Sequence, residues 1–459
     1  MHNLILDTDS YKASHYLQYP PGTVGLFNYL ESRGGEYKET VFFGLQYLLY
    51  KYLNKPIEFS DVDEAAVFFK KHGLPFNRDG WDLIASEHDG LIPLRIKAVD
   101  EGTVVPVGFP LLSCESTDPR LPWVVGWFET MLMRLWYPIT VSTVSYHLKQ
   151  MILESLIETS DDPHNQIPFK LHDFGSRGVS SYESAAIGGA AHLVNFMGSD
   201  TVPGILLANE YYEADMAGFS IPAAEHSTIT SWGRENEEQA YENMLTQFAK
   251  PGSLVAIVSD SYDIFHAVNR IWGESLRQKV IDSGATVVIR PDSGEPVTMV
   301  NQLLFALESR FGSKVNSKGY RVLNHVRIIQ GDGVNPYTIS RILLSAKLAG
   351  FSTENLAFGM GGALLQKVDR DTQKFAYKCS SIRIQNCGGD EAGTDRDVFK
   401  DPVTDPGKRS KAGRIGTAFA DGKFQVVPDN DPSNILKVRY ENGQLFNTTT
   451  LAEIRERAK

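Results

Sequence analysis

The sequence contains few cysteines, is short of positive charge and has no long apolar run. Its three cysteines, Cys114, Cys379 and Cys387, are odd in number and lack the spacing of a metal site, so a reducing compartment is favoured over a disulfide-linked secreted fold. The formal net charge of −11 argues against a nucleic-acid-binding protein, because such proteins usually present a basic face. We therefore expect no nucleic-acid partner.

The hydrophobicity pattern also argues against a membrane protein. The most hydrophobic window, residues 123–136, is interrupted by Glu129 and Arg134 and is too short to cross a bilayer. It predicts a buried amphipathic helix instead. The first ten residues, MHNLILDTDS, lack the basic region and the apolar core of a signal peptide. These features predict a cytoplasmic protein with no membrane partner.

The middle third of the sequence alternates between strand and helix patterns. Short apolar runs between His172 and Gly362 each end in a cluster of acids, glycines or other polar residues, and the clusters are LHDFGSRG (171–178), NFMGSD (195–200), PAAEHS (222–227), AIVSDS (256–261), VIRPDSG (288–294), RIIQGDG (327–333) and AFGMGG (357–362). Parallel strands that all present chemistry at one rim are typical of a catalytic barrel. Since no GxGxxG motif opens the region, a closed barrel is favoured over an open doubly wound sheet.

Individual elements of this region can be predicted from the residues. Residues 255–258, 286–289 and 326–329 are β-branched runs, as expected for strands that are buried on both faces of a parallel sheet. Residues 264–272 carry a helical stripe. Asn335-Pro336 begins a second helix, which a glycine at position 350 ends.

Both ends of the chain have the pattern of antiparallel strands. Residues 94–98, 381–384 and 436–439 alternate with period two, and Asp421-Gly422 and Asn442-Gly443 are strong hairpin turns. The predicted fold class is therefore α/β: an irregular, TIM-like (β/α) barrel over residues 166–375, and a discontinuous β-rich sheet domain formed by residues 1–165 and 376–459.

The predicted rim carries groups that suit a phosphorylated sugar. Asp292 and Asp332 are carboxylates flanked by glycines, which let the backbone approach the hydroxyl groups of a ligand closely. The FGMGG turn over 358–362 offers backbone N–H groups of the kind that bind phosphate. Arg177, Arg290 and Arg327, at or beside strand ends, could bind phosphate in a bidentate manner. Together these groups suggest a phosphorylated ribose.

Long motifs along almost the whole chain carry a family resemblance. They are TDSYKASHYLQYPPGT (8–23), VFFGLQYLL (41–49), LHDFGSRGVSS (171–181), AHLVNFMGSDT (191–201), PAAEHSTITSWG (222–233), VSDSYDI (258–264), IRPDSG (289–294), IQGDGV (329–334), FGMGGALLQKVDRD (358–371) and VFKDPVTDPGKRSKAGR (398–414). In these motifs the chain resembles the nicotinamide phosphoribosyltransferase family. The resemblance implies the reaction of nicotinamide with 5-phosphoribosyl 1-pyrophosphate to give nicotinamide mononucleotide and pyrophosphate. It also implies an irregular α/β barrel with a sheet domain, in a homodimer whose active sites lie at the subunit interface.

The resemblance assigns roles around the pyridine ring. Phe174 resembles the aromatic residue that stacks on one face of the ring, and Tyr11, which shares the TDSYK motif with Asp9, resembles the residue that covers the other face from the partner subunit. Asp200 resembles the carboxylate that accepts a hydrogen bond from the substrate amide. A carboxylate at that position repels the carboxylate of nicotinic acid. Ser176 departs from the pattern, since an aromatic residue is common at this position.

The resemblance also assigns roles at the ribose and phosphate sites. Asp292 resembles a ribose-binding acid, as does Asp332 beside Gly331. The remaining expected substrate contacts are Arg177, Arg290, Arg327, Gly361 and Gly362, together with Arg370, Lys378, Lys400 and Lys408, and some of these last four are expected from the second subunit. His226 resembles a histidine that ATP phosphorylates. Glu225 and Asp260 are expected to orient its imidazole.

The implied chemistry needs few groups of the protein beyond these. Mg²⁺ is expected to arrive with the pyrophosphate substrate, so no protein metal ligands are predicted, and ATP is expected as a facilitating co-substrate. Nicotinic acid phosphoribosyltransferase is the main alternative, and Asp200 argues against it. A non-catalytic barrel that binds NAD metabolites would be expected to lack the rim acids. Another sugar-phosphate barrel enzyme would need a lysine or glutamate directed at a carbonyl group.

Overall fold

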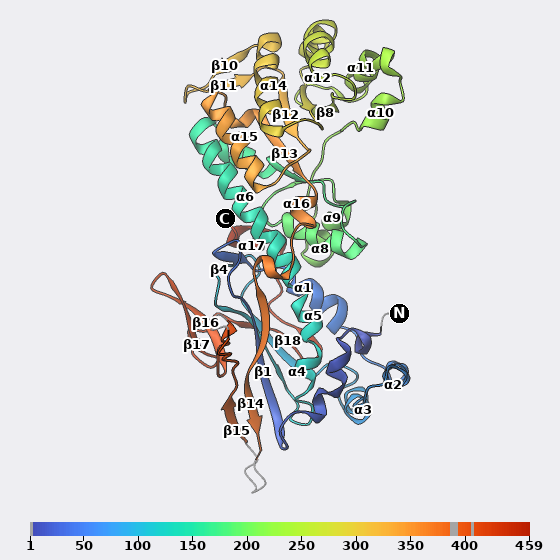
Figure 1. The fold of residues 1–459 in the computed structure, drawn as a ribbon, viewed down its shortest axis with the longest axis vertical. Coiled ribbons are helices and arrows are strands. Elements are labelled where there is room, and N and C mark those ends of the chain that lie inside the picture. Colours follow the sequence, from blue (N-terminus) through green and yellow to red (C-terminus); the bar gives the residue numbers. More distant parts are fainter. Residues whose placement is uncertain (1–2, 386–392, 405–407) are drawn as a thin grey trace. The chain divides into compact units, whose positions relative to one another are not determined.

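A computed structural model describes residues 3–385, 393–404 and 408–459 (Figure 1). The chain forms two compact units. The first unit comprises Met1–Thr143, Tyr211–Glu213 and Asp369–Lys459, and the second comprises Val144–Glu210 and Ala214–Val368. The first boundary falls inside α6 (Trp136–Thr159), whereas the sequence placed it near residue 165. An uninterrupted helix contains no local signal for such a boundary.

The first unit is built around a seven-stranded antiparallel sheet to which both ends of the chain contribute. Its strand order is β15-β14-β1-β5-β3-β18-β19. The strands are β1 (Thr23–Ser32), β3 (Leu94–Ala98), β5 (Pro110–Ser116), β14 (Phe375–Ile384), β15 (Thr394–Asp397), β18 (Lys437–Glu441) and β19 (Gln444–Leu445). The antiparallel pairing of β1 with β14 joins the two chain ends. This agrees with the shared sheet that the alternating patterns predicted.

Both predicted hairpin turns are present in the first unit. Asp421-Gly422 joins β16 (Ile415–Ala420) to β17 (Lys423–Pro428), with φ of 52° and 73°. Asn442-Gly443 joins β18 to β19, with φ of 49° and 85°. Two-residue hairpin turns of this type require positive φ at both positions, which asparagine, aspartate and glycine tolerate best. The residues of the two turns therefore determine where these hairpins form.

Short helices and a small sheet complete the first unit. They are η1 (Leu4–Leu6), η2 (Ser10–Leu17), β2 (Glu39–Val41), α1 (Leu45–Leu48), η3 (Leu49–Leu53), α2 (Phe59–His72), α3 (Arg78–Glu87), β4 (Val104–Pro106), α4 (Val124–Trp127), α5 (Glu129–Met133), η8 (Arg370–Thr372) and α17 (Leu451–Arg457). The single helix predicted over 123–136 is thus wrong in part, because the chain breaks at Phe128 into α4 and α5. Glu129 faces Lys12, whose Nζ donates to its carboxylate at 2.6 Å. That buried lysine is a tertiary partner that the local pattern could not predict.

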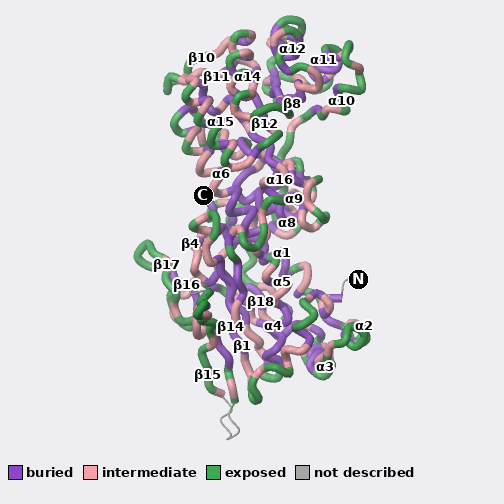
Figure 2. The backbone as a smooth tube through the Cα atoms, in the orientation of Figure 1, coloured by how far each residue is buried: buried purple, intermediate pink, exposed green. Residues whose placement is uncertain are grey.

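The second unit contains a six-stranded parallel sheet. Its order is β7-β6-β13-β12-β9-β8, and the strands are β6 (Leu171–Asp173), β7 (Gly198–Ser199), β8 (Leu254–Val258), β9 (Thr286–Arg290), β12 (Val326–Gln330) and β13 (Leu356–Met360). Three of these strands match the predicted β-branched runs. Figure 2 shows their residues largely buried, as expected for a parallel sheet covered on both faces.

Helices connect the strands of the second unit. They are α7 (Pro163–Gln166), η4 (Ile167–Phe169), α8 (Tyr182–His192), α9 (Val202–Tyr211), α10 (His226–Thr230), η5 (Arg234–Asn236), α11 (Glu237–Phe248), α12 (Ile264–His266), η6 (Ala267–Ser275), α13 (Arg277–Ser283), α14 (Pro296–Phe311), α15 (Pro336–Leu348), η7 (Thr353–Asn355) and α16 (Gly362–Leu365), with a small hairpin of β10 (Ser313–Val315) and β11 (Arg321–Leu323). The Asn335 side chain caps α15 by accepting from the backbone N–H groups of Tyr337 and Thr338. This confirms the predicted helix start. The helix predicted over 264–272 begins as α12 and continues as the π-helical η6.

Regular pairing leaves the parallel sheet open, as a half-barrel. The edge strands β7 and β8 are not paired with each other. Each instead makes an isolated parallel bridge to the segment 219–223, through Gly198 to Phe219 and through Ala256 to Ala223. Pro222 has no N–H group to donate, which prevents a continuous ladder there. A complete TIM-like barrel of regular strands is therefore not observed.

In the part of the chain that the structure describes, no helix is both long and apolar enough to span a membrane.

Candidate active site

The carboxyl ends of four parallel strands meet around one cavity of about 420 Å³ in the second unit. The chain segments after β6, β9, β12 and β13 all reach it, because parallel strands place their carboxyl ends at the same edge. Eight residues predicted from the sequence line this cavity: Phe174, Arg177, Arg290, Asp292, Gly331, Asp332, Gly361 and Gly362. The rim clusters therefore converge as the strand pattern predicted.

A second, smaller cavity of about 250 Å³ shares three of these residues. Phe174, Arg177 and Arg290 line both cavities, and Asp200 lines the smaller one together with Ser176. The two cavities thus form one site with an aromatic ring and two guanidinium groups where they meet. Ser176, the departure from the family pattern, faces this site with a small polar side chain.

Phe174 is positioned by a glycine that sequence reasoning did not select. A Cβ atom at Gly359 of β13 would lie 1.9 Å from Cε2 of Phe174, so the ring rests directly on the strand backbone. The Phe174 backbone N–H donates to the Met360 carbonyl at 3.1 Å. The ring also packs against the buried cluster formed by Ala256, Val288 and Ile329. The FGMGG motif contained the relevant signal, since its first glycine lies inside a buried strand, where glycine marks a close approach.

Asp292 and Arg290 form a charged pair at the cavity. Arg290 Nη2 donates to Asp292 Oδ2 at 3.2 Å. Arg290 Nε is buried and has no hydrogen-bond partner among the described residues. A Cβ atom at Gly331 would lie 3.6 Å from Asp292 Oδ1 and 3.7 Å from Arg290 Nε, which places the backbone after β12 beside both groups. The pair therefore offers the buried, unpartnered Nε donor and a carboxylate to a ligand.

His226 lies between two of the predicted acids. Its Nε2 is 3.1 Å from Asp260 Oδ1, and its Nδ1 is 3.7 Å from Asp292 Oδ2. Asp260 Oδ2 accepts from the Asp292 backbone N–H at 2.8 Å and from the Ser293 hydroxyl at 2.5 Å. The loop after β9 is therefore fixed to the end of β8, and the imidazole is oriented by that same carboxylate.

Glu225 has a structural role at the start of α10. Its backbone N–H donates to the Thr228 hydroxyl at 3.2 Å, and its carboxylate accepts from the Ser227 hydroxyl. Both contacts are typical of a helix N-cap. Of the two acids predicted to orient His226, the described hydrogen bonds join only Asp260 to the imidazole.

Asp200 follows β7 and is exposed to solvent. Its Oδ1 accepts from the Ser220 hydroxyl at 2.5 Å, and its backbone N–H donates to the Asp173 carbonyl at 3.0 Å. Asp173 itself is buried, and burial raises the pKa of its carboxyl group to about 6. The side chain available to a ligand is therefore that of Asp200, not that of its buried neighbour.

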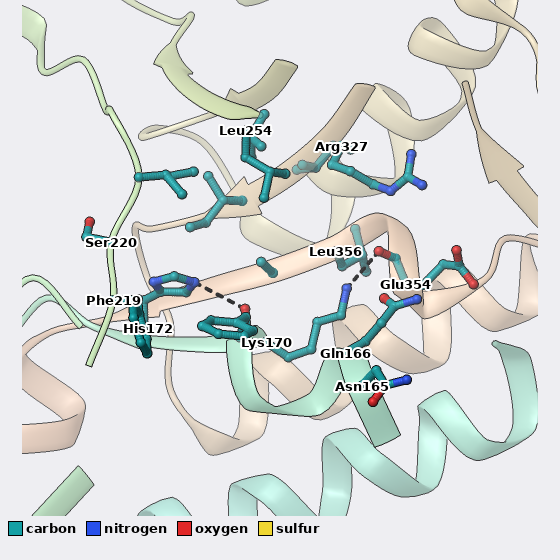
Figure 3. Close-up of a pocket in the computed structure, with 16 residues that line it drawn as sticks. Asn165, Gln166, Lys170, His172, Phe219, Ser220, Leu254, Arg327, Glu354 and Leu356 are labelled. Atoms are coloured by element: carbon teal, nitrogen blue, oxygen red, sulfur yellow. Dashed lines mark hydrogen bonds between the residues drawn. The ribbon is translucent and has the colours of Figure 1, made fainter. Parts of the chain in front are cut away.

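Arg327 does not lie at the substrate cavity, in contrast to the prediction. It is near the amino end of β12, and its Nη1 donates to the carbonyls of Leu323 at 2.6 Å and Val326 at 2.8 Å. It lines a separate cavity of about 370 Å³, shown in Figure 3. The sequence placed Arg327 in the cluster RIIQGDG, which follows the strand pattern. Because β12 begins at Val326, Arg327 is the second residue of the strand and lies at the opposite end from the rim.

The cavity in Figure 3 is mainly apolar, with charged groups at one side. Lys170 Nζ donates to the Glu354 carbonyl at 2.8 Å. Burial, together with the positive charge of Arg327, lowers the pKa of Lys170 to about 7. His172 Nε2 is 3.1 Å from the Phe169 carbonyl. None of these residues was predicted as a site residue except Arg327.

The other predicted contacts belong to the first unit: Asp9, Tyr11, Arg370, Lys378, Lys400 and Lys408. Tyr11 is 58% exposed. Burial lowers the pKa of Lys378, and the nearby positive charges of Arg33, Lys400 and Arg370 contribute in the same direction. These four side chains therefore form a cationic cluster. Arg33 was not predicted, and its Nε is buried without a hydrogen-bond partner among the described residues.

One cation at the larger cavity was not predicted. Lys367 lines the larger cavity, although the sequence did not single it out within FGMGGALLQKVDRD. Among the residues that the structure describes, no group of three or more histidine, cysteine, aspartate or glutamate side chains could hold a metal ion. The cavity is therefore lined by cations, two carboxylates and a glycine-rich backbone.

Comparisons with known proteins identify the family of the chain. The profile of the nicotinate phosphoribosyltransferase (NAPRTase) family matches residues 169–444, and that of the nicotinamide phosphoribosyltransferase N-terminal domain matches residues 3–96. A nicotinamide phosphoribosyltransferase of Xanthomonas campestris pv. campestris (strain 8004) is 55% identical, over 99% of this chain and 98% of that protein. A nicotinamide phosphoribosyltransferase of Acinetobacter baylyi is 31% identical, over 98% of this chain and 95% of that protein.

Solved structures support the fold. A nicotinate-nucleotide pyrophosphorylase from Pyrococcus furiosus matches with a TM-score of 0.59 and 15% identity, over 99% of this chain and 95% of that chain. Human nicotinic acid phosphoribosyltransferase matches with a TM-score of 0.56 and 16% identity, over 98% of this chain and 92% of that chain. The chain therefore belongs to the nicotinate phosphoribosyltransferase family and, within it, to the nicotinamide phosphoribosyltransferases.

Proposed function

We propose that this enzyme joins nicotinamide to 5-phosphoribosyl 1-pyrophosphate and releases nicotinamide mononucleotide and pyrophosphate, in the biosynthesis of NAD. One observation carries this proposal: Phe174 and Arg290 line two adjoining cavities, one holding Asp200 and the other holding Asp292, Asp332 and the glycine turn. A flat base and a phosphorylated sugar need these two environments side by side.

The smaller cavity is suited to the base. The face of Phe174 is electron-rich and can stack on a pyridine ring, which becomes cationic in the product. Asp200 can accept a hydrogen bond from the amide NH₂ group. The same carboxylate would face the negative charge of nicotinic acid, which is unfavourable by several kcal/mol in general. We therefore favour nicotinamide over nicotinic acid as the base.

The larger cavity is suited to the ribosyl donor. Asp292 and Asp332 can accept hydrogen bonds from the ribose hydroxyl groups, and the unused Nε of Arg290 can donate to the donor. The turn at Gly361 and Gly362 can donate backbone N–H groups to the 5-phosphate. Arg177 and Lys367 add positive charge near that turn.

The reaction follows from positioning and from charge stabilisation. The bond from C1 of the ribose to the pyrophosphate oxygen breaks, and the pyridine nitrogen forms a new bond to C1 without losing a proton. Groups that hold both reactants and stabilise the leaving anion therefore supply most of the catalysis. We propose that the cationic cluster of Arg33, Arg370, Lys378 and Lys400 binds phosphate groups in a homodimer, with Asp9, Tyr11 and Lys408 contributed across the subunit interface.

Magnesium is proposed to accompany the pyrophosphate. Because Mg²⁺ keeps several waters and binds phosphate oxygens readily, it needs few protein ligands, and the carboxylates of Asp292 and Asp332 in the larger cavity are suitable for it. When bound it would reduce the negative charge of the leaving group.

We also propose how the barrel is closed and in which compartment the protein acts. The segment 219–223 acts as an irregular seventh strand that closes the barrel, supported by its bridges to both sheet edges. The protein acts in the cytoplasm, supported by Cys114 and Cys379, which are both free thiols.

The function is tested by comparing the two bases in the wild type and in Asp200→Asn. Wild-type enzyme should form nicotinamide mononucleotide with nicotinamide and react much more slowly with nicotinate. In Asp200→Asn the ratio of kcat/KM values for the two bases should fall by about 10-fold to 100-fold, because the repulsion of the acid is removed. Asp215→Asn, an exposed substitution on the chain that leads to segment 219–223, is the control. Unchanged discrimination in Asp200→Asn would contradict the role of Asp200, and a wild-type preference for nicotinate would contradict the function.

A second prediction concerns ATP. We propose that the imidazole of His226 receives the γ-phosphoryl group of ATP, with release of ADP. Asp260 orients the ring, and Asp292, which lines the larger cavity, lies 3.7 Å from its Nδ1. His226→Gln should reduce the ratio of rates with and without ATP to about one, because glutamine cannot be phosphorylated in this way. Initial rates of product formation at fixed donor concentration measure this ratio. A variant that ATP still stimulates would refute the phosphohistidine.

A further inference from the structure

Ser220 is held beside Asp200 by backbone pairing. Phe219, the residue before Ser220, bridges to Gly198 of β7 in parallel register. The Phe219 N–H donates to the Met197 carbonyl at 2.7 Å, and the Phe219 carbonyl accepts from the Ser199 N–H at 3.0 Å. Ser220 therefore has a defined place next to the chain that carries Asp200, although its own side chain is exposed.

The contact between the two side chains is short and charged. The Ser220 hydroxyl donates to Asp200 Oδ1 at 2.5 Å, which is the distance expected for an O–H···O⁻ hydrogen bond. No described residue donates to the other oxygen, Oδ2. The bond therefore occupies one carboxylate oxygen and leaves the second free for a ligand in the smaller cavity, which Asp200 lines.

The surroundings make this bond important for orientation. The hydrogen bonds described above fix the backbone of Asp200, but its exposed side chain could otherwise turn toward water. Ser220 lies at the edge of the separate cavity of about 370 Å³, near Phe219 and His172, as Figure 3 shows. Burial lowers the pKa of His172, and the described hydrogen bond of its Nε2 goes to the Phe169 carbonyl, not to Asp200.

We propose that Ser220 is a positioning residue that determines the preference for an amide base over an acid base. Its hydroxyl orients the Asp200 carboxylate and stabilises its negative charge, so that Oδ2 accepts from the amide NH₂ group and repels a carboxylate. This inference rests on the proposed function, because it assumes that Asp200 contacts the base. Neither the sequence motifs nor the family resemblance assigned Ser220 a role.

The test compares nicotinamide and nicotinate in full-length Ser220→Ala, Ser220→Thr and wild-type enzyme. Ser220→Ala should lower kcat/KM for nicotinamide by about 10-fold, as expected for loss of a hydrogen bond to a charged group, while kcat/KM for nicotinate stays unchanged or rises. Ser220→Thr keeps the hydroxyl group and should retain the wild-type ratio within about threefold. Because Ser220 is exposed, both variants are expected to fold, and thermal unfolding measures this directly.

Ser317→Ala provides the matched control. Its hydroxyl donates to Asp161 Oδ1 at 2.6 Å, so this substitution also breaks a short serine–aspartate bond, and neither residue lines the substrate cavities. The ratio of the two bases should not change in Ser317→Ala. The proposal is overturned if Ser220→Ala keeps the wild-type ratio, whether or not both rates fall together. A wild-type enzyme that prefers nicotinate would instead overturn the proposed function, and the inference with it.

Discussion

Gly359→Ala should lower kcat/KM for nicotinamide by about 100-fold, equivalent to about 2.7 kcal/mol of transition-state stabilisation. A methyl group at this position would lie 1.9 Å from Cε2 of Phe174, far inside van der Waals contact. Since β13 is paired on both sides, the strand cannot move away, and the ring must leave its position in the site. The stacking surface for the base would then be displaced. Steady-state kinetics with both substrates, at saturating donor, measure this loss.

A double-mutant cycle separates the displacement of the Phe174 ring from a general loss of folding. In a Phe174→Leu background, the further substitution Gly359→Ala should cost much less, because the ring that it displaces is already absent. Both residues contact each other, so strong non-additivity is expected. Equal losses from Gly359→Ala in the two backgrounds would show that the glycine acts through something other than Phe174. A Gly359→Ala enzyme with wild-type kinetics would contradict the packing itself.

Asp292→Ala should lower kcat/KM for 5-phosphoribosyl 1-pyrophosphate by about 1,000-fold or more, in the range found when a group that stabilises the transition state is removed. Asp292 is the one carboxylate at the cavity that contacts both Arg290, at 3.2 Å, and His226, at 3.7 Å. Its loss would remove an acceptor for the ribose hydroxyl groups and leave two cationic or ionisable partners without their counter-charge. Initial rates over a range of donor concentrations test this.

Two comparisons make the Asp292 result specific. Asp292→Asn keeps the shape and one acceptor oxygen, so its loss should be smaller than that of Asp292→Ala. Asp282→Ala removes an exposed carboxylate on α13 that contacts only Gln278 among the described residues, and it should leave the kinetics unchanged. If Asp292→Ala retained more than a tenth of wild-type kcat/KM, the proposed ribose contact would be wrong.

Local chemistry accounts for the elements that were predicted well. The runs at 255–258, 286–289 and 326–329 became β8, β9 and β12 because runs rich in β-branched residues suit a strand buried on both faces. The turns at Asp421-Gly422 and Asn442-Gly443 formed because those residues tolerate positive φ. In each case the physical cause lies within a few residues of the element.

Predictions failed where the cause was distant in the sequence. The helix expected over 123–136 breaks at Phe128, where Glu129 meets the buried Lys12 from the start of the chain. Arg327 faces the separate cavity, because its side chain is held by the carbonyl of Leu323, which precedes its strand, and by that of Val326, the first residue of the strand. Gly359, Ser220 and Arg33 were missed because their significance lies in what contacts them.

By itself, the sequence determined the kinds of element, the turn positions and the presence at strand ends of the acids, arginines and glycines that a ribosyl donor and a pyridine base require, since these depend on short-range periodicity and residue chemistry. Only the tertiary structure decided that 219–223 bridges the two edges of the sheet, that Phe174 rests on Gly359, and that Ser220 reaches Asp200. Those contacts join residues twenty to nearly two hundred positions apart, and strand pairing, not local propensity, brings them together.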